Sequence, residues 1–395
     1  MTWLAPLLCT TLDLRAVEIA RSLRQQHPSD GDHVVRAWEQ RFGRWLARGH
    51  VRACASGRGA LYAVTRALGL GPGDGVVVPA FTCQSVLNAF HHAGVQTQAA
   101  DIETQTFGLD VDATRAAITP STRALMVQHS FGLAGRDLEA LLSLARERRL
   151  LVIEDCAHAL GGRSAGRPLG SLGDAAIFSF ERGKVLTTVH GGMAVVQGEA
   201  AAQRLDRCIG AAPFPSADDT DALLASVEHD YWTLVGTDSG QAEQARTQLG
   251  PRTLPRMWPE EFEGRFCSIY AQRMSAPVAA LADSQFDRLE EVLAMRRAQA
   301  AHWMHWARRA GLPTARVPDG SQPAWLRFPV WASPALKADP SPLEASLGVE
   351  VGLWFTSPSH PVPSTLGRCP RGMAACASVV NLPTLLPAGH PHRHR

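Results

Sequence analysis

The sequence predicts an α/β protein, with a large domain built on a mostly parallel sheet between helices and a smaller α+β domain at the C-terminus. Apolar strand-like runs alternate with helical patterns between about residues 33 and 200, as a parallel sheet covered on both faces requires. This alternation ends after about residue 200, where a different pattern begins. The length of 395 residues suits two or three compact units.

Two amphipathic patterns predict the first helices of the large domain. Apolar residues at i, i+4, i+7 and i+8 within 38–46 form one helical face, and this helix should end near Gly49. The pattern over 61–68 predicts a second helix, stopped by Gly69 and the turn at 71–74.

The remaining elements of the large domain are strands and one further helix. A helix is predicted over 138–148, between two of the strands. The predicted strands are Val76–Val78, Ala124–Gln128, Leu150–Ile153, Ala175–Phe180 and Met193–Val196.

The C-terminal part is predicted to differ from the large domain. Residues 210–255 are rich in Pro, Asp and Thr and are interpreted as a loop-rich insertion, and a long helix broken once is predicted over 276–310. A short strand follows at 325–330. We therefore divide the chain into an N-terminal arm (1–32), a large domain (33–255) and a small C-terminal domain (256–395).

Composition and charge exclude several classes of protein. With 45% hydrophobic and 19% charged residues the chain is not disordered, and a net charge of +2 gives no basic field for nucleic acid. No apolar run approaches the roughly 20 residues of a membrane helix, and the start lacks the features of an export signal. We expect a cytoplasmic location, no nucleic-acid partner and no membrane contact.

The cysteines and the C-terminal tail predict no metal site. Eight cysteines occur without a CxxC motif or a regular spacing, so they are interpreted as reduced thiols. The histidine-rich tail at 389–395 can bind metal adventitiously, but a frayed terminus is the interpretation that we favour.

The first of three chemical motifs is Ala55-Ser56-Gly57-Arg58-Gly59, immediately before the second predicted helix. Backbone N–H groups at a helix N-terminus bind phosphate readily. A Ser-Gly pair at this position is also common as a simple helix cap, and the motif alone does not separate the two interpretations.

The second motif is Glu154-Asp155-Cys156-Ala157-His158, at the end of an apolar strand. Ligands of open α/β sheets bind beyond the carboxyl ends of the strands, where Asp155 should lie. A buried carboxylate there can keep the pyridine nitrogen of pyridoxal 5'-phosphate (PLP) protonated, and His158 can bind its phenolic oxygen. The alternatives are an Asp that caps the next helix and a His satisfied in the core.

The third motif is Phe178-Ser179-Phe180-Glu181-Arg182-Gly183-Lys184, a strand that leads into a lysine-containing loop. Burial and nearby positive charge lower the pKa of a lysine and give the neutral amine that Schiff-base formation needs. Ser179 can donate to a phosphate. The alternative interpretation is a lysine that extends to the surface.

In this order the motifs resemble the DegT/StrS-type sugar aminotransferases, PLP enzymes of the aspartate aminotransferase fold (fold type I). The resemblance extends from about residue 33 to 387. Further segments that carry it are Gly71–Asp74, Val78–Thr82, His129–Gly132, Gly173–Asp174, Arg273–Ser275, Ala279–Leu281 and Asn381–Thr384.

The resemblance implies a fold, a cofactor and a reaction. It implies a seven-stranded-type sheet, PLP as cofactor, and a homodimer with active sites at the interface. An amino acid, glutamate or glutamine, would donate an amino group to a keto acceptor. The family favours a nucleotide-linked keto-sugar in polysaccharide or secondary-metabolite biosynthesis as that acceptor.

The resemblance also implies individual roles. Lys184 would be the Schiff-base lysine and the acid/base, Asp155 would bind the pyridine nitrogen, and His158 would lie by the phenolic oxygen. The other cofactor-binding residues would be Ser56, Gly57 and Ser179 around the phosphate, together with Ala157.

Four positions depart from the family pattern. Arg58 stands in place of a Thr and can still pair with phosphate. Cys83 stands where an aromatic commonly stacks on the cofactor ring, unless Phe81 takes over that role. His190 replaces the Glu of a Gly-Glu-Gly-Gly motif, and Ala271 replaces an Asn that a neighbouring subunit often lends to the phosphate. Because of these departures, the identity of the acceptor, sugar or not, is left open.

Two other functions compete with this prediction. A PLP enzyme can act on a non-sugar carbonyl or catalyse dehydration, but family dehydratases replace the lysine, so Lys184 argues against dehydration. A non-catalytic PLP-fold protein that regulates or scaffolds a pathway needs neither Asp155 nor Lys184.

Overall fold

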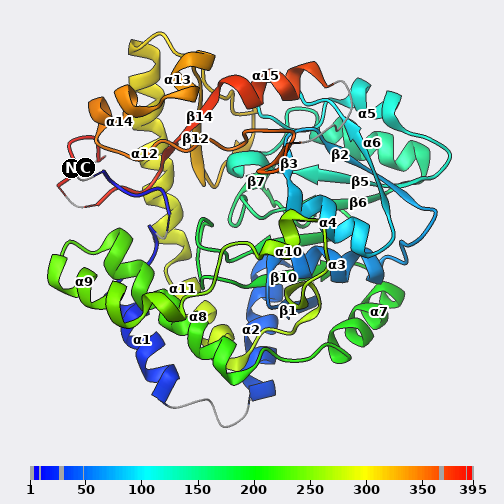
Figure 1. The fold of residues 1–395 in the computed structure, drawn as a ribbon. Coiled ribbons are helices and arrows are strands. Elements are labelled where there is room, and N and C mark those ends of the chain that lie inside the picture. The colour runs from blue at the N-terminus through cyan, green and yellow to red at the C-terminus, as the bar shows by residue number, and fades with distance from the viewer. Residues whose placement is uncertain are drawn as a thin grey trace.

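A computed structural model of the chain describes residues 4–8, 10–25, 31–47, 49–363, 369–387 and 389–393, and a seven-stranded sheet runs through its centre (Figure 1). The strands are β1 (His50–Cys54), β2 (Gly75–Pro79), β4 (Gln96–Ala100), β5 (Thr122–Gln128), β6 (Leu151–Asp155), β9 (Ala175–Ser179) and β10 (Gly192–Val196). Their order is β1-β10-β9-β6-β5-β2-β4. The five strands from β9 to β4 pair in parallel and β10 pairs antiparallel with both neighbours, which confirms the predicted mostly parallel sheet.

Most strands of the sheet are apolar because helices cover both faces. Every residue of β2, β9 and β10 is buried. The edge strand β4 reads Gln-Thr-Gln-Ala-Ala and is mostly half-buried, so its sequence carried no apolar run from which to predict it. β1 was also not predicted, since Arg52 interrupts its apolar pattern.

Helices on the two faces form separate hydrophobic cores, to which alternate strand residues contribute. One core joins α2 (Gly31–Leu46), α6 (Leu138–Arg148) and α11 (Ala276–Phe286) to Val77 of β2. The other joins α3 (Gly57–Ala67), α4 (Gln84–His92) and α7 (Glu199–Gly210) to the neighbouring Val76 and Val78. This period of two is expected for a strand buried on both sides.

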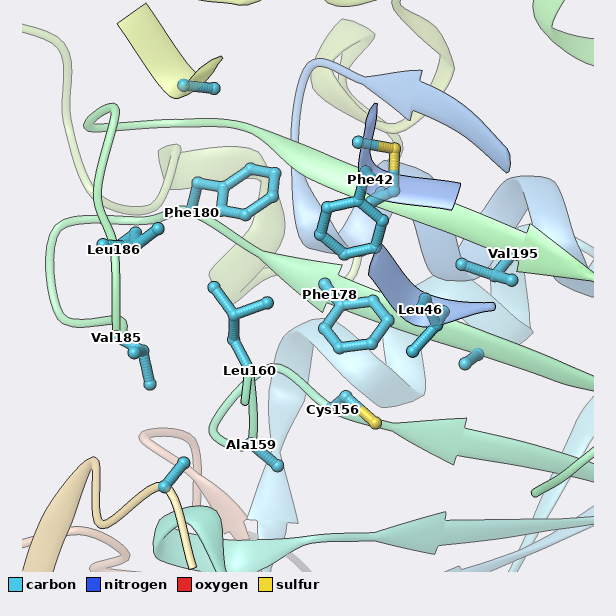
Figure 2. Close-up of a cluster of buried hydrophobic side chains, with 14 of the residues drawn as sticks. Phe42, Leu46, Cys156, Ala159, Leu160, Phe178, Phe180, Val185, Leu186 and Val195 are labelled. Atoms are coloured by element: carbon cyan, nitrogen blue, oxygen red, sulfur yellow. The ribbon is translucent and has the colours of Figure 1, made fainter. Parts of the chain in front are cut away.

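An aromatic cluster fixes α2 on the sheet. Figure 2 shows Phe42 of α2 beside Phe178 and Phe180 at the end of β9. The ring centroids of Phe42 and Phe178 lie 5.0 Å apart at an interplanar angle of 73°, an edge-to-face geometry that stabilises aromatic pairs. This packing secures the strand end from which the lysine loop departs.

The C-terminal part contains the predicted long helix with its break. It is divided into α11 and α12 (Leu289–Arg309) by a kink at Asp287–Arg288. β12 (Arg327–Trp331) pairs antiparallel with β14 (Val379–Pro383). Three helices complete this part near the top of Figure 1: α13 (Pro334–Ala338), α14 (Ser341–Leu347) and α15 (Pro370–Ser378).

The prediction of a loop-rich insertion at 210–255 was wrong, because this segment contains α8 (Ala217–Asp230), a π-helical turn (Tyr231–Val235) and α9 (Ser239–Gln248). Two polar residues of this segment are helix caps: Ser216 accepts a hydrogen bond from the Asp219 N–H, and Asp238 caps α9 in the same way. α8 lies beside α1 (Leu14–Gln25) of the N-terminal arm (Figure 1), and Arg24 of α1 pairs with Asp221 of α8 at 2.8 Å.

No described helix has the length and apolar character that crossing a membrane requires.

Candidate active site

A cavity of about 300 Å³ opens where β6 and β9 end and α3 begins, and the three sequence motifs meet at its wall. This is the edge of the sheet where α/β proteins bind ligands. All the predicted site residues except Phe81 line the cavity: Ser56, Gly57, Arg58, Cys83, Asp155, Ala157, His158, Ser179 and Lys184.

Phe81 lies outside the cavity, in an aromatic core. Its ring centroid is 4.8 Å from that of Phe355 and 5.7 Å from that of Phe107, and the side chain is fully buried. Because its ring packs against these neighbours and does not line the cavity, we do not assign Phe81 to the cofactor. Cys83, at the N-terminus of α4, lines the cavity, and burial raises the pKa of its thiol to about 11.

The N-terminus of α3 provides donors for an anion. Ser56 caps the helix: its Oγ accepts from the Gly59 N–H at 3.0 Å and donates to the Ile269 carbonyl at 3.0 Å. Because the Ser56 hydroxyl proton is already donated to Ile269, this side chain acts as the helix cap and has no proton left for a phosphate. In the first turn of α3, the N–H groups of Gly57 and Arg58 have no intrahelical acceptors. They lie at the positive end of the helix dipole, which faces the cavity.

Gly57 is required by the close approach of β9. A Cβ at this position would lie 2.6 Å from Ser179 Cβ and 2.8 Å from Ser179 Oγ, closer than real contacts allow. The absence of a side chain brings the Ser179 hydroxyl beside the helix N-terminus, so one phosphate can reach both.

We predict that Gly57→Ala destabilises the protein by about 1–3 kcal/mol through overpacking and weakens cofactor binding. Urea unfolding and PLP titration measure the two effects. Gly210→Ala is the matched control, because a Cβ there meets nothing within 4 Å. Equal unfolding midpoints and PLP affinities for both variants would contradict the packing argument.

Glu154 orders the strand end that carries Asp155. Its carboxylate is fully buried and accepts from the N–H groups of Gly170, Leu172 and Gly173 and from His129 Nε2, at 2.6–3.1 Å. Burial by itself would raise the pKa of this carboxyl. The hydrogen bonds outweigh burial, the one from His129 most of all, and hold the pKa below its usual value. Glu154 therefore stays ionised, and its hydrogen bonds hold the loop after β8 (Arg167–Pro168) in place.

The same arrangement argues against a metal ion at this position. His129, Glu154 and Cys156 bring three possible ligand atoms within 4.8 Å of one another. The four hydrogen bonds that Glu154 accepts use the lone pairs that a metal would need.

Asp155 faces the cavity as a nearly buried carboxylate. Its Oδ1 accepts from the Ala157 N–H at 2.9 Å. Burial raises the pKa of Asp155, partly opposed by this bond and by the charge of Lys184. A cationic N–H from a ligand is the partner that would stabilise such a carboxylate as an anion.

His158 is a neutral donor next to an aromatic wall. Burial lowers the pKa of His158 well below its usual range, with the charges of Lys184 and Arg327 adding to the effect. Its Nδ1 accepts from the Phe131 N–H at 3.2 Å, so we place the ring proton on Nε2. The ring stacks on Trp354 at 5.3 Å between centroids and 12° between planes.

Lys184 lies in the cavity wall with its Nζ 5.3 Å from the centroid of the Trp354 ring. Burial lowers the pKa of this amine, while the charge of Glu181 opposes that shift. Burial raises the pKa of Glu181, but the charges of Arg256 and Lys184 outweigh it and hold that pKa well below its usual range. The lysine therefore combines a lowered pKa with a permanent negative neighbour.

The cavity is also lined by residues that were not predicted as site residues, among them Glu181, Arg256, Trp354 and His360. Glu181 lay inside the third motif but had no assigned role. Trp354 and His360 come from the C-terminal part, where β13 (Ser359–His360) pairs with β3 (Thr82–Cys83) and brings His360 to the cavity. No local motif marks these residues in the sequence.

The site fits PLP on the chemistry of its donors. The α3 N-terminus and the Ser179 hydroxyl suit the phosphate, and Arg58 Nε is buried without a partner among the described residues. Asp155 suits a pyridinium nitrogen, and the Lys184 amine suits an aldehyde. The cavity thus offers a group for each end of the cofactor.

Sequence comparison places these features in a known family. A protein-family model described as the DegT/DnrJ/EryC1/StrS aminotransferase family matches residues 13–387. GDP-perosamine synthase of Caulobacter vibrioides is 39% identical over 178 residues, which are 45% of this chain and 48% of that protein. The 3-amino-5-hydroxybenzoate synthase of Amycolatopsis mediterranei is 36% identical over 165 residues, 42% of each chain. These matches span less than half the length of either curated relative.

Solved structures show the same fold over nearly the whole chain. An aminotransferase from Psychrobacter cryohalolentis superimposes with a TM-score of 0.71 at 19% identity, covering 96% of this chain and 95% of that one. NtdA of Bacillus subtilis, solved with the cofactor pyridoxamine phosphate (PMP), gives 0.69 at 19% identity and covers 97% and 81%. The structural likeness establishes the fold.

Proposed function

The chain belongs to the DegT/DnrJ/EryC1/StrS aminotransferase family, and from this premise we propose that it moves an amino group from an amino acid to a keto acceptor. The family is PLP-dependent. The observation that carries the proposal is the convergence of Lys184, Asp155 and the α3 N-terminus on one cavity. A protein that only scaffolds a pathway has no need of a buried amine facing a buried carboxylate.

We assign the cofactor contacts to residues of this chain. The N–H groups of Gly57 and Arg58 and the hydroxyl of Ser179 bind the phosphate. The Asp155 carboxylate binds the protonated pyridine nitrogen, and the His158 Nε2–H donates to the phenolic oxygen. When bound, PLP supplies a ring that withdraws electrons from the substrate carbon next to nitrogen.

Lys184 is the covalent anchor of the cofactor and the acid/base of the reaction. Burial lowers the pKa of its amine, and this shift favours the neutral form that acts as a base. In that form Nζ takes a proton from the substrate carbon, and in its cationic form it returns the proton. Trp354, beside Nζ, excludes water from that side of the cavity.

We propose a nucleotide-linked keto-sugar as the acceptor, with glutamate or glutamine as the amino donor. The perosamine synthase of Caulobacter vibrioides, named for a GDP-linked amino sugar, supports this acceptor class. The similarity to 3-amino-5-hydroxybenzoate synthase favours a second candidate, a cyclic keto acceptor that is not a sugar.

The test is to incubate purified protein and PLP with a panel of amino donors and keto acceptors. We expect glutamate or glutamine to convert the bound cofactor to PMP, seen as loss of the near-visible absorbance, and a nucleotide-linked keto-sugar to restore it. Protein that takes up no PLP, or that shows neither half-reaction with any pair, contradicts the proposal.

We also propose a C₂ homodimer with the active sites at its interface, on the family resemblance. Because Ala271 offers no amide, we expect Arg58 to replace the partner's usual contact to the phosphate. Light scattering at working concentration checks the dimer, and a monomeric mass would contradict it.

A further inference from the structure

A salt bridge forms part of the cavity wall next to the reacting lysine. Arg256 Nε donates to Glu181 Oε1 at 2.8 Å, and both residues line the cavity. Glu181 is the more enclosed partner, since its side chain is 17% exposed and that of Arg256 is 44% exposed. Neither residue is among the cofactor contacts assigned above, so the role of the pair depends on its other neighbours.

Glu181 is held by the same turn that carries Lys184. Its Oε2 accepts from the Gly183 N–H at 2.9 Å, and its carbonyl oxygen accepts from the Lys184 N–H at 2.9 Å. These two bonds fix the carboxylate relative to the backbone of the lysine. The carboxylate therefore has a defined position near the amine.

The Trp354 ring is a common neighbour of this carboxylate and the amine. A Cβ on Gly183 would lie 3.1 Å from Cη2 of the ring and 3.3 Å from Glu181 Oε2. Lys184 Nζ lies 5.3 Å from the centroid of the same ring. Because the indole displaces water, charges beside it interact more strongly than charges in bulk solvent.

The two members of the salt bridge act on the amine with opposite signs. Burial lowers the pKa of Lys184, the charge of Glu181 opposes that shift, and the charge of Arg256 adds to it. Burial raises the pKa of Glu181, but the charges of Arg256 and Lys184 outweigh burial. Glu181 is therefore an anion throughout the neutral pH range.

Other titratable groups of the cavity wall are neutral at neutral pH. Burial raises the pKa of the Cys83 thiol to about 11, and it lowers the pKa of His360 to about 4 and that of His190 to about 3. Burial also lowers the pKa of His158 well below its usual range. These four side chains add no formal charge beside the amine.

Charged groups also approach from other elements. Asp155, at the end of β6, adds a second negative charge, which we assign to the pyridine nitrogen. Arg58 Nη1, in α3, lies 3.1 Å from Glu261 Oε1, which offsets its charge. Arg327 of β12 lies over the Trp354 ring, with Cζ 5.4 Å from the centroid. Since all of them stay the same when the salt bridge is altered, they are a constant background.

We propose that Glu181 and Arg256 are positioning residues for the proton of Lys184: the carboxylate favours the protonated nitrogen, and the guanidinium limits that preference. A group that both takes and returns a proton works best when both of its forms are populated at the operating pH. The inference rests on the proposed aminotransferase function, which makes Lys184 the reacting amine.

The test follows the protonation of Lys184 directly, by NMR of cofactor-free protein labelled with ¹³C at lysine Cε. The chain contains two lysines, so two signals are expected, and Lys184→Ala assigns them. At a fixed pH within the titration, the ratio of neutral to protonated Lys184 should rise about 3- to 10-fold in Glu181→Gln. It should fall in Arg256→Gln, by about 2- to 5-fold, because solvent screens this more exposed charge.

The opposite signs exclude a purely structural role for the salt bridge. If either substitution only loosened the cavity wall, water would enter and relieve the burial that lowers the pKa of Lys184, so the neutral fraction would fall in both variants. Glu181→Asp keeps the charge and should lie closer to the parent than Glu181→Gln.

A surface pair provides matched controls for the two substitutions. Arg167 Nη2 donates to Glu139 Oε1 at 2.9 Å, and both side chains are exposed. Arg167→Gln and Glu139→Gln should leave the Lys184 titration unchanged. The Lys337 signal is an internal standard, because its pKa is lowered by burial and Cys376 is the charged neighbour that opposes the shift.

PLP-loaded protein provides a second readout that needs no turnover. The near-visible absorbance of the lysine–PLP link changes when its nitrogen loses a proton. The midpoint of this change should move to lower pH in Glu181→Gln and to higher pH in Arg256→Gln, as for the free amine.

The outcomes separate this inference from the proposed function. An unchanged or smaller neutral fraction in Glu181→Gln, or a larger one in Arg256→Gln, overturns the inference, and transamination by the parent then leaves the function standing. Opposite shifts support the inference. A parent protein that takes up no PLP sinks the function, while the NMR titration still decides whether the salt bridge controls the proton of Lys184.

Discussion

Replacing Lys184 with alanine should reduce transamination by at least about 10²- to 10⁴-fold while the protein stays folded. The substitution removes the covalent anchor of the cofactor together with the amine that moves the proton. It deletes no large apolar group from a core. Noncovalent contacts through Gly57, Ser179 and Asp155 should still retain PLP or PMP.

The chain offers a matched control for this variant, because it contains only two lysines, Lys184 and Lys337. Lys337 is also buried, its pKa is lowered by burial to about 8, and its Nζ donates to Phe355 O at 2.8 Å. Steady-state kinetics of Lys184→Ala and Lys337→Met, with circular dichroism of each, measure the difference. Comparable turnover in Lys184→Ala and the parent would show that another group does the chemistry.

Asp155→Asn should lower activity by at least about 10- to 100-fold, because a neutral amide does not stabilise a pyridinium as a carboxylate does. Cofactor content should fall much less. In the parent, Asp155 Oδ1 accepts a hydrogen bond from the Ala157 N–H at 2.9 Å. The amide oxygen of the variant can still accept this bond, so the strand end should keep its shape.

Bound cofactor and kcat are measured on the same Asp155→Asn preparation. Asp339→Asn, an exposed aspartate that accepts a hydrogen bond from Ser341 N–H, serves as the control and should behave like the parent. If Asp155→Asn transaminates like the parent, Asp155 is only a cap on the turn that follows β6.

Much of the sheet and the centre of the site could be predicted because their signals are local. The apolar runs of β2 and β9 and the motif residues at their ends depend on neighbours in the sequence. Lysine usage is a further signal in the sequence. Only two of the 39 Lys and Arg residues are lysines, and Lys184 is one of them; a lysine can supply a neutral amine, whereas an arginine stays protonated.

The errors have physical reasons. In 210–255, Ser216 and Asp238 are of residue types that favour turns and also cap helices, and tertiary packing, such as that of α8 against α1, decides between the two. Phe81 and Cys83 are two residues apart, and the sequence did not show which would face the cavity. The aromatic neighbours that hold Phe81 in the core come from distant parts of the chain.

The residues of the cavity wall that were missed share one property. Arg256, Trp354 and His360 reach the site through tertiary packing of the segment that follows α9 and of the C-terminal part. Their positions depend on pairings such as β3 with β13, which join segments more than 250 residues apart. A single sequence carries no local pattern for such contacts.

Borohydride reduction of the PLP-loaded protein, followed by peptide mass spectrometry, tests the central claim most directly. Reduction converts a lysine–PLP link into a stable secondary amine, and with two lysines in the chain the assignment is unambiguous. We expect a label on the peptide that contains Lys184, and none in Lys184→Ala. A label on the Lys337 peptide, or no label on the parent, would contradict it.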